Sequence, residues 1–382
     1  MSVLLAIIAP VIGALIVGLF RINKAAWLVA FTAIAVSIFG LVQAEKNKVY
    51  YWPWLPELGL NLSFITDSLA LFFAFVVTVM GLFISVYSAA YFQHSGQHNT
   101  RFYSCLLLFI AAMIGTVLSN NILVLFIFWE LTGVLSFLLI GFNYTTQAGQ
   151  TGSRMALIIT ATTGLILFTG LIILGGAYQT YAFNQMLYST PLSIGLITTA
   201  FSLIIIGAIG KSAQFPLHFW LPNAMAAPTP VSAFLHSATM VKLGVFLVAR
   251  FYPIFVPYTI WGLIASIGFI TMVVGAVLSL TVRDIKAILA YTTVSQLGYL
   301  IGFYGLGSVS GISHDFIHIL NHVLYKGSLF MIAGILIHAF HTQDTRRMGH
   351  AFTYMPLAGV AAAISLLSMA GVPGTMGFLS KE

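Results

Sequence analysis

The chain has 382 residues, of which 60% are hydrophobic and only 6% are charged, and its mean hydropathy is +1.02. This composition is typical of a protein that lies almost wholly in a lipid bilayer, and no stretch is polar enough for a soluble domain. The formal net charge of +7 comes from single Lys and Arg residues scattered over short loops. That scatter excludes the clustered basic patch of a nucleic-acid-binding protein.

Taken in chain order, apolar runs separated by short polar breaks predict about twelve membrane-spanning helices. They lie near residues 2–20, 25–43, 68–92, 102–119, 121–141, 155–177, 192–220, 230–255, 259–281, 285–306, 311–340 and 355–380. The first lacks the basic start of a cleaved secretion signal, so we expect it to be retained with its N-terminus outside. Most basic residues, including Arg283 and Lys286, then fall in loops of the cytoplasmic face, as the positive-inside rule requires. Arg250 is expected in a loop of the outer face.

The longest connection, residues 45–67, is expected to be exposed, with the aromatic run Tyr50 to Trp54 as an anchor at the outer membrane interface. The single cysteine, Cys105, lies in an apolar run, which excludes disulfides and thiolate metal sites. Neither a dinucleotide-binding nor a P-loop glycine motif is present, so no nucleotide and no other cofactor is expected.

Two predicted spans carry an interruption that combines Gly, Pro, Ser and Lys. One is the stretch 207–216 with Lys211, and the other is the stretch 371–381 with Lys381. Paired interrupted helices are typical of transporters built from inverted repeats, with the ion site near the bilayer midplane. We therefore expect one membrane domain over 1–382, with N-terminal helices at 1–101, a first five-helix repeat at 102–255 and a second, incomplete repeat at 256–382. Because the chain stops directly after Lys381, it is expected to be part of a longer protein.

Ionisable side chains inside these spans are the candidate functional residues, because a charge at bilayer depth costs about 2.5 kcal/mol or more. Glu130 and Lys211 are expected to face each other, so that each sets the protonation of the other. A fixed ion pair that only orients helices, or a lysine reaching for the interface, is the alternative. His236 and Lys242 lie in the eighth span, where His236 is expected to share a helical face with Thr239. A proton relay or simple hydrogen-bonded packing fits His236.

The eleventh span holds four such residues at steps of four: His314, His318, His322 and Lys326. Each step is one helical turn of about 6 Å, which suits a water-bridged proton wire. A metal or haem site and structural polar packing are the alternatives. Asp315, the only acidic residue nearby, is expected to be turned away from this stripe, so no metal is expected.

Several motifs now indicate a family. Residues 128–132, 210–216 and above all 218–242 resemble the A subunit of Mrp-type multisubunit Na+/H+ antiporters, and the stretches 284–298, 320–326 and 377–382 extend the resemblance. The wider family includes the proton-pumping subunits of respiratory complex I and of membrane-bound hydrogenases. The resemblance implies an all-α polytopic membrane fold with a fourteen-helix core, inverted five-helix repeats and broken helices 7 and 12. The last two core helices and a C-terminal extension are absent from this chain.

The resemblance also implies roles for individual residues. The positions matching Glu130 and Lys211 form an ion pair that gates proton entry. In the family, a central hydrophilic axis continues through the positions that match His236, Lys242, His318, His322, Lys326 and Lys381.

From these observations we expect a proton-translocating subunit of a multisubunit Na+/H+ antiporter, multi-pass in a prokaryotic cytoplasmic membrane. Its expected partners are other integral membrane subunits, protons, a monovalent cation and the lipid bilayer. The alternative is a proton-pumping subunit of a complex I-type or membrane hydrogenase complex, with no redox chemistry of its own. Further alternatives are a haem- or metal-carrying electron-transfer protein and an inert scaffold subunit.

Overall fold

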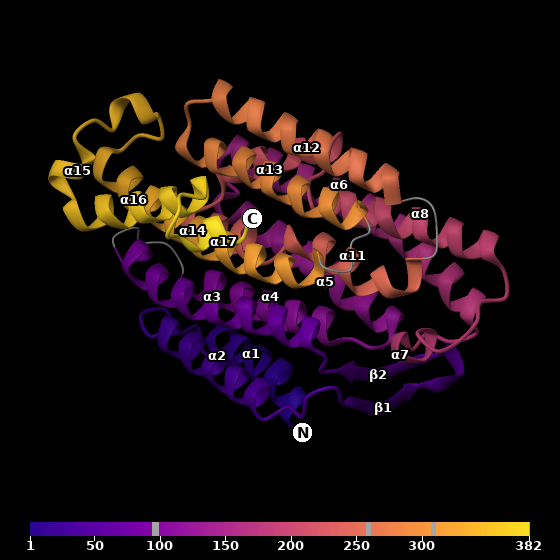
Figure 1. The fold of residues 1–382 in the computed structure, drawn as a ribbon. Coiled ribbons are helices and arrows are strands. Elements are labelled where there is room, and N and C mark those ends of the chain that lie inside the picture. The colour runs from indigo at the N-terminus through magenta and orange to yellow at the C-terminus, as the bar shows by residue number, and fades with distance from the viewer. Residues whose placement is uncertain (94–98, 257–260, 307–310, 382) are drawn as a thin grey trace. The chain divides into compact units, whose positions relative to one another are not determined.

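The computed structural model describes residues 1–93, 99–256, 261–306 and 311–381, with residues 56 and 311–314 described by their backbone alone (Figure 1). The N-terminal half contains α1 (Ser2–Leu19), α2 (Ala26–Val42), α3 (Ser68–Phe92), α4 (Asn99–Leu118), α5 (Ile122–Ile140), α6 (Gln147–Tyr178) and the short α7 (Phe183–Met186). The remaining helices are α8 (Ile194–Lys211), α9 (Trp220–Asn223), α10 (Thr229–Ser237), α11 (Lys242–Phe255), α12 (Trp261–Thr281), α13 (Ile285–Gly305), α14 (Gly311–Phe340), α15 (Ala351–Tyr354), α16 (Pro356–Ala370) and α17 (Met376–Leu379).

Each of the twelve apolar segments contains a helix. Within the described ranges, nine spans are long and apolar enough to cross a membrane, the broken α10–α11 stretch counting as one. The helices α2 and α16 are apolar but shorter. The helical membrane fold is therefore confirmed, whereas the count of twelve spans stays a prediction.

A β-hairpin occupies the connection for which the sequence predicted only an exposed segment. Strands β1 (Val49–Leu55) and β2 (Leu60–Ile65) pair antiparallel, with an irregularity between Pro53 and Leu55. The alternation of apolar and polar residues over 60–64 is the sequence signal for β2. The backbone amide of Asn120 donates to the Ser63 carbonyl at 2.8 Å, which ties the hairpin to the turn between α4 and α5.

The chain divides into two compact units, which are described separately. The first comprises residues 1–139, 157–211 and 246–260, and the second comprises residues 140–156, 212–245 and 261–382. The three predicted segments 1–101, 102–255 and 256–382 are a division along the sequence and stay a prediction.

In the first unit α1 packs against α2 and α4, and α3 packs against the same two helices. Glycines let helices of this unit approach closely, as expected for helices in lipid. A Cβ added to Gly207 of α8 would lie 2.6 Å from the Leu167 Cβ of α6. One added to Gly170 of α6 would lie 2.9 Å from the Ala200 carbonyl oxygen of α8.

In the second unit α12 and α13 are closely packed side by side (Figure 1). A Cβ on Gly268 of α12 would lie 2.2 Å from the backbone nitrogen of Gly302 in α13, so this contact is made backbone to backbone. The helix α14 packs against α10, α13 and α16.

Two loops of the second unit are joined by their backbones. The amide of Ile285 donates to the Gln343 carbonyl, and the amide of Thr345 donates to the Arg283 carbonyl, both at 3.0 Å. Hydrogen bonds from Arg346 to Asp344 lower the pKa of that half-buried carboxyl to about 2. These loops, which hold Arg283, Arg346 and Arg347, therefore lie on one face, as the positive-inside pattern predicted.

Both predicted interruptions are present, and a third was not predicted. The helix α8 ends at Lys211 and is followed by Ala213 at φ +50°, and α16 ends where Gly371 adopts φ +79°. The third break separates α10 from α11 at residues 238–241, where the apolar pattern predicted one continuous helix.

Candidate functional site

Lys211 is the last residue of α8 and is only 1% exposed. Its ammonium group donates to the Trp129 carbonyl and to the Thr132 hydroxyl, each at 2.6 Å, and lies 4.3 Å from the centroid of the Trp129 ring. Because α8 ends at Lys211, no further turn of this helix follows the lysine. An ammonium at a helix C-terminus also complements the helix dipole.

Glu130 is half-buried on α5, one residue after the carbonyl that Lys211 contacts. No ion pair joins Glu130 and Lys211 within 4.0 Å: in the described part of the chain the ion pairs are Lys48–Glu45, Arg250–Asp67 and Arg346–Asp344. Instead, the Glu130 carboxylate packs against Gly164 of α6, where an added Cβ would lie 2.0 Å from Oε1. The ammonium is thus held by α5 backbone and hydroxyl oxygens next to the carboxylate, rather than by the carboxylate itself.

Replacing Gly164 with alanine should push the Glu130 carboxylate out of its position. Moving a side chain about 30° off its rotamer costs about 0.5–1.5 kcal/mol, so the cation/proton exchange that the sequence leads us to expect should fall by about two- to tenfold. Exchange in membrane vesicles, normalised to the amount of chain in the membrane, measures this effect. The matched control is Gly176→Ala on the same helix, because an added Cβ there meets nothing within 4 Å. Equal exchange in the two variants would contradict the prediction.

In the second unit, Lys242 and His322 are in direct contact. The Lys242 ammonium lies 2.8 Å from Nδ1 of His322, and both side chains are at most 1% exposed. The ammonium also donates to the Ser237 carbonyl, which the unpredicted break after α10 leaves without its helical partner. When Lys242 is charged, Nδ1 of His322 accepts, so that Nε2 carries the ring hydrogen. That Nε2 has no hydrogen-bond partner among the described residues.

Two further residues of α14 continue this row. The Lys326 ammonium is fully buried and donates to the Leu289 carbonyl at 3.0 Å and to the Thr292 hydroxyl of α13. The His318 Nδ1 lies 3.3 Å from the Ser380 hydroxyl, just after α17, and its Nε2 is buried without a partner in the described chain. The predicted stripe is therefore buried at these three α14 positions. The side chain of His314 lies outside the described residues.

His236 is fully buried near the end of α10, and neither ring nitrogen has a partner among the described residues. Its ring centroid lies 6.3 Å from that of Trp220. The expectation that Thr239 shares a helical face with His236 is wrong, because α10 ends at Ser237. The Thr239 hydroxyl instead donates to the Phe234 carbonyl at 2.9 Å.

Lys381 lies two residues after the end of α17 and is exposed in the described chain. Its ammonium donates to the Met369 carbonyl at 2.7 Å, in the last turn of α16 before the break. This contact mirrors that of Lys211: in both cases a lysine meets a backbone carbonyl beside an interrupted helix.

Sequence reasoning missed three buried charged residues, and the expectation of loop positions for two of them is wrong. Lys286 is 3% exposed in the first turn of α13 and donates to the Met225 and Ala227 carbonyls at 2.7 and 2.6 Å. The signal for its helix was Asp284, which caps α13 by accepting from the Ala287 amide. Arg250 is 2% exposed inside α11. Asp315 is 5% exposed on α14 rather than turned away from the buried stripe.

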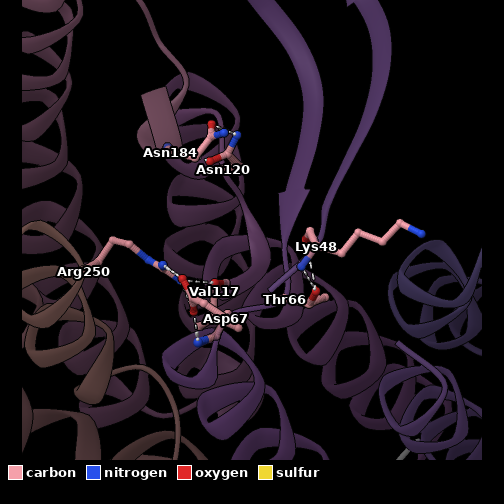
Figure 2. A network of polar contacts seen from close by, with 8 residues as sticks. Lys48, Thr66, Asp67, Val117, Asn120, Asn184 and Arg250 are labelled. Atoms are coloured by element: carbon pink, nitrogen blue, oxygen red, sulfur yellow. Dashed lines mark hydrogen bonds and ion pairs between the residues drawn. The ribbon is translucent and has the colours of Figure 1, made fainter. Parts of the chain in front are cut away.

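Arg250 belongs to a polar network of the first unit at the base of the hairpin (Figure 2). Its guanidinium forms an ion pair with Asp67 and donates to the Val117 carbonyl at 3.2 Å. It also lies 5.2 and 5.3 Å from the ring centroids of Phe183 and Phe246. In the same view Lys48 bonds to Thr66 through its backbone while its side chain points away.

A metal centre was one alternative for the histidine stripe. In the described part of the chain, no three His, Cys, Asp or Glu side chains lie close enough together to hold a metal ion. What the second unit does bring together is a row of amine, imidazole and hydroxyl groups inside apolar helices. Groups of this kind bind and release protons without a cofactor.

Comparison with known proteins places this arrangement in a family. Residues 119–382 match the family described as "NADH:quinone oxidoreductase/Mrp antiporter, TM", and residues 52–103 match "NADH-Ubiquinone oxidoreductase (complex I), chain 5 N-terminus". The chain belongs to the NADH:quinone oxidoreductase/Mrp antiporter family. The family match and the apolar helices together show that it is a multi-pass membrane protein.

Individual members of the NADH:quinone oxidoreductase/Mrp antiporter family are similar over most of the chain. It is 43% identical to the A/B subunit of the "Probable K(+)/H(+) antiporter" of Rhizobium meliloti, over 91% of this chain and 35% of that protein. It is 40% identical to the A1 subunit of the "Na(+)/H(+) antiporter" of Staphylococcus aureus, over 99% of this chain and 50% of that protein. The chain thus spans half the length, or less, of these two relatives.

Two solved membrane complexes contain a chain with the same fold. A chain in the Mrp complex from Dietzia sp. DQ12-45-1b aligns with a TM-score of 0.90 and 31% identity, over 100% of this chain and 42% of that one. A chain of an archaeal membrane-bound sulfane sulfur reductase aligns with a TM-score of 0.89 at 20% identity, over 99% of this chain and 80% of that one. At that identity, the second likeness shows the fold alone.

Proposed function

We propose that this chain is a proton-translocating part of a multisubunit cation/proton antiporter in a prokaryotic cytoplasmic membrane. Protons would pass along Glu, Lys and His side chains of the membrane helices and their breaks, which include Glu130, Lys211, His236, Lys242, His318, His322, Lys326 and Lys381. The relatives named as Na+/H+ and K+/H+ antiporter subunits support the class of reaction. Because their names differ in the cation, both Na+ and K+ are candidates.

The observation that carries this proposal is the contact between Lys242 and His322. An amine and an imidazole lie 2.8 Å apart in a fully buried site, which is within the distance for direct proton transfer. Two such groups in contact cannot both carry a charge cheaply, because like charges in a low-dielectric interior repel strongly. One proton shared by the pair therefore moves between them when a neighbouring charge changes.

The proposal is tested by ion exchange in inverted membrane vesicles from an antiporter-deficient host that expresses the full gene cluster. A fluorescent pH probe reports proton movement after addition of Na+ or K+. We expect exchange with the complete cluster and its loss when this chain is omitted or carries Lys242→Met. Exchange that persists without the chain would overturn the proposal.

The second candidate is a proton-pumping subunit of a redox-driven complex, because the matched family is named for NADH:quinone oxidoreductase as well as for the antiporter. The two candidates share every buried residue and differ in their partner subunits. Purification of the tagged chain from its native membrane separates them. Small membrane subunits alone favour the antiporter, whereas quinone-reducing or hydrogenase modules favour the redox complex.

A further inference from the structure

Asp315 is a buried acid that none of the roles above uses. It is 5% exposed on α14, three residues before His318 and seven before His322. With about 100° of rotation per residue, seven residues bring a side chain to within about 20° of the same direction. Asp315 therefore points within the angular range of the stripe from His318 to Lys326. Steps of four residues, which defined the stripe in the sequence, pass over this position.

The partners of Asp315 come from α13. The Tyr304 hydroxyl donates a hydrogen bond to the Asp315 carboxylate, and Tyr299 interacts with it electrostatically. The ring centroid of Tyr299 lies 4.7 Å from that of His318, so this tyrosine contacts the imidazole next in the row. No cation of the described residues lies within 4.0 Å of the Asp315 carboxylate. Tyr299 therefore lies between the carboxylate and the first imidazole of the row.

The position along the helices identifies the face to which Asp315 belongs. The loops before α13 and after α14 are bonded to each other and hold Arg283, Arg346 and Arg347, and the positive-inside rule assigns such loops to the cytoplasmic side. Tyr304, one residue before the end of α13, and Asp315, near the start of α14, therefore lie at the opposite, outer end of these two helices. Lys326 lies 11 residues further along α14, about 16 Å toward the cytoplasmic side.

A carboxylate buried without a cation is costly, so such a group is expected to hold a proton unless a positive charge comes close. A positive charge arises three residues further along the same helix, about one turn away, whenever His318 is protonated. On this geometry, and resting on the function proposed above, we propose that Asp315 is the outer proton-exchange group of the row formed by Lys242, His322 and His318.

The transfer conserves charge and protons. In the outward direction the neutral acid releases its proton to the outer aqueous side, and the resulting carboxylate takes one proton from the His318 imidazolium. Acid and imidazole are then both neutral, and His318 can accept the next proton from His322. In the inward direction, the same steps run in reverse. The hydroxyls of Tyr299 and Tyr304 hold the carboxylate beside the row and do not change their own charge.

The test compares Asp315→Asn, which cannot carry a proton, with Asp315→Glu, which can. We expect Asp315→Asn to lower exchange in the vesicles by about tenfold or more, as for removal of a positioned acid-base group. Asp315→Glu should retain exchange, with a dependence on the pH of the outer side that is displaced toward higher pH, because Glu titrates about 0.4 units above Asp. The matched control is Glu57→Gln, an exposed acid of the hairpin that should leave exchange unchanged.

Several described groups could also shape that pH dependence. Those that face Asp315 or act on its neighbour His318 are Tyr299, Tyr304, Lys242 and Lys381. If the pH profile of exchange is displaced in Asp315→Glu while these four residues are unchanged, the pH dependence belongs to position 315. An unchanged profile, or wild-type exchange in Asp315→Asn, overturns the proposal. If wild-type exchange survives in Lys242→Met as well, the proposed function itself fails, so the two failures are distinguishable.

Discussion

Replacing Lys211 with alanine is expected to abolish cation/proton exchange while the chain still folds and assembles. The ammonium donates hydrogen bonds to the Trp129 carbonyl and the Thr132 hydroxyl, and none of the ion pairs among the described residues includes it. Its removal leaves the half-buried Glu130 carboxylate without this neighbouring positive charge, but the Thr132 hydroxyl still donates to the Trp129 carbonyl at 2.7 Å. The loss of two hydrogen bonds to a charged group costs about 1.5–3 kcal/mol each at most, which a polytopic protein tolerates.

A second substitution separates charge from proton transfer at this position. Lys211→Arg keeps a positive charge against the same carbonyl and hydroxyl, but the guanidinium does not release its proton. We expect exchange to be lost in Lys211→Arg as it is in Lys211→Ala. The matched control is Lys24→Ala, since this lysine is exposed in the loop between α1 and α2. Vesicle exchange and the amount of assembled complex are measured together. Wild-type exchange in Lys211→Arg would show that only the charge of Lys211 matters.

The fold was predictable where hydrophobicity alone decides it. Each long apolar run forms a helix, and the runs of Gly and Pro near Lys211 and Gly371 mark two real breaks. The break at 238–241 was not predictable, because the stretch Ala-Thr-Met-Val contains neither Gly nor Pro. The ammonium of Lys242 bonds to the Ser237 carbonyl that this break exposes, and this tertiary contact partly compensates the lost helical bond.

The sequence was enough to predict which residue types form the candidate site, but not which groups their side chains contact. Counting every basic residue as a topology marker assigned Arg250 and Lys286 to loops, although both side chains are buried against backbone carbonyls. Asp315 was expected to be turned away from the stripe, because a stripe read in steps of four omits the position seven residues from His322. The pairing of Glu130 with Lys211 was inferred from opposite charge, whereas the Trp129 carbonyl and the Thr132 hydroxyl on the helix of Glu130 hold the ammonium.

Removing Arg250 is expected to destabilise the first unit more than any exposed substitution. Arg250→Met leaves the Asp67 carboxylate, which is 27% exposed, without its guanidinium partner, and it leaves the Val117 carbonyl unbonded. Breaking one side of a buried pair costs about 3–5 kcal/mol, because an uncompensated charge remains. We therefore expect a large fall in the midpoint of unfolding, measured on purified protein in detergent by titration with a denaturing surfactant.

The double variant Asp67→Asn with Arg250→Met tests whether the loss comes from the stranded charge. Asparagine keeps the cap of α3, where Asp67 accepts from the Ala70 amide at 2.8 Å, but carries no charge. Because replacing both members of a buried pair is often nearly neutral, the double variant should recover most of the stability lost by Arg250→Met. The control is Lys48→Met, which breaks an exposed pair with Glu45 and should cost about 1 kcal/mol or less. A double variant as unstable as Arg250→Met would mean that Arg250 acts through its packing on Phe183 and Phe246 instead of through its charge.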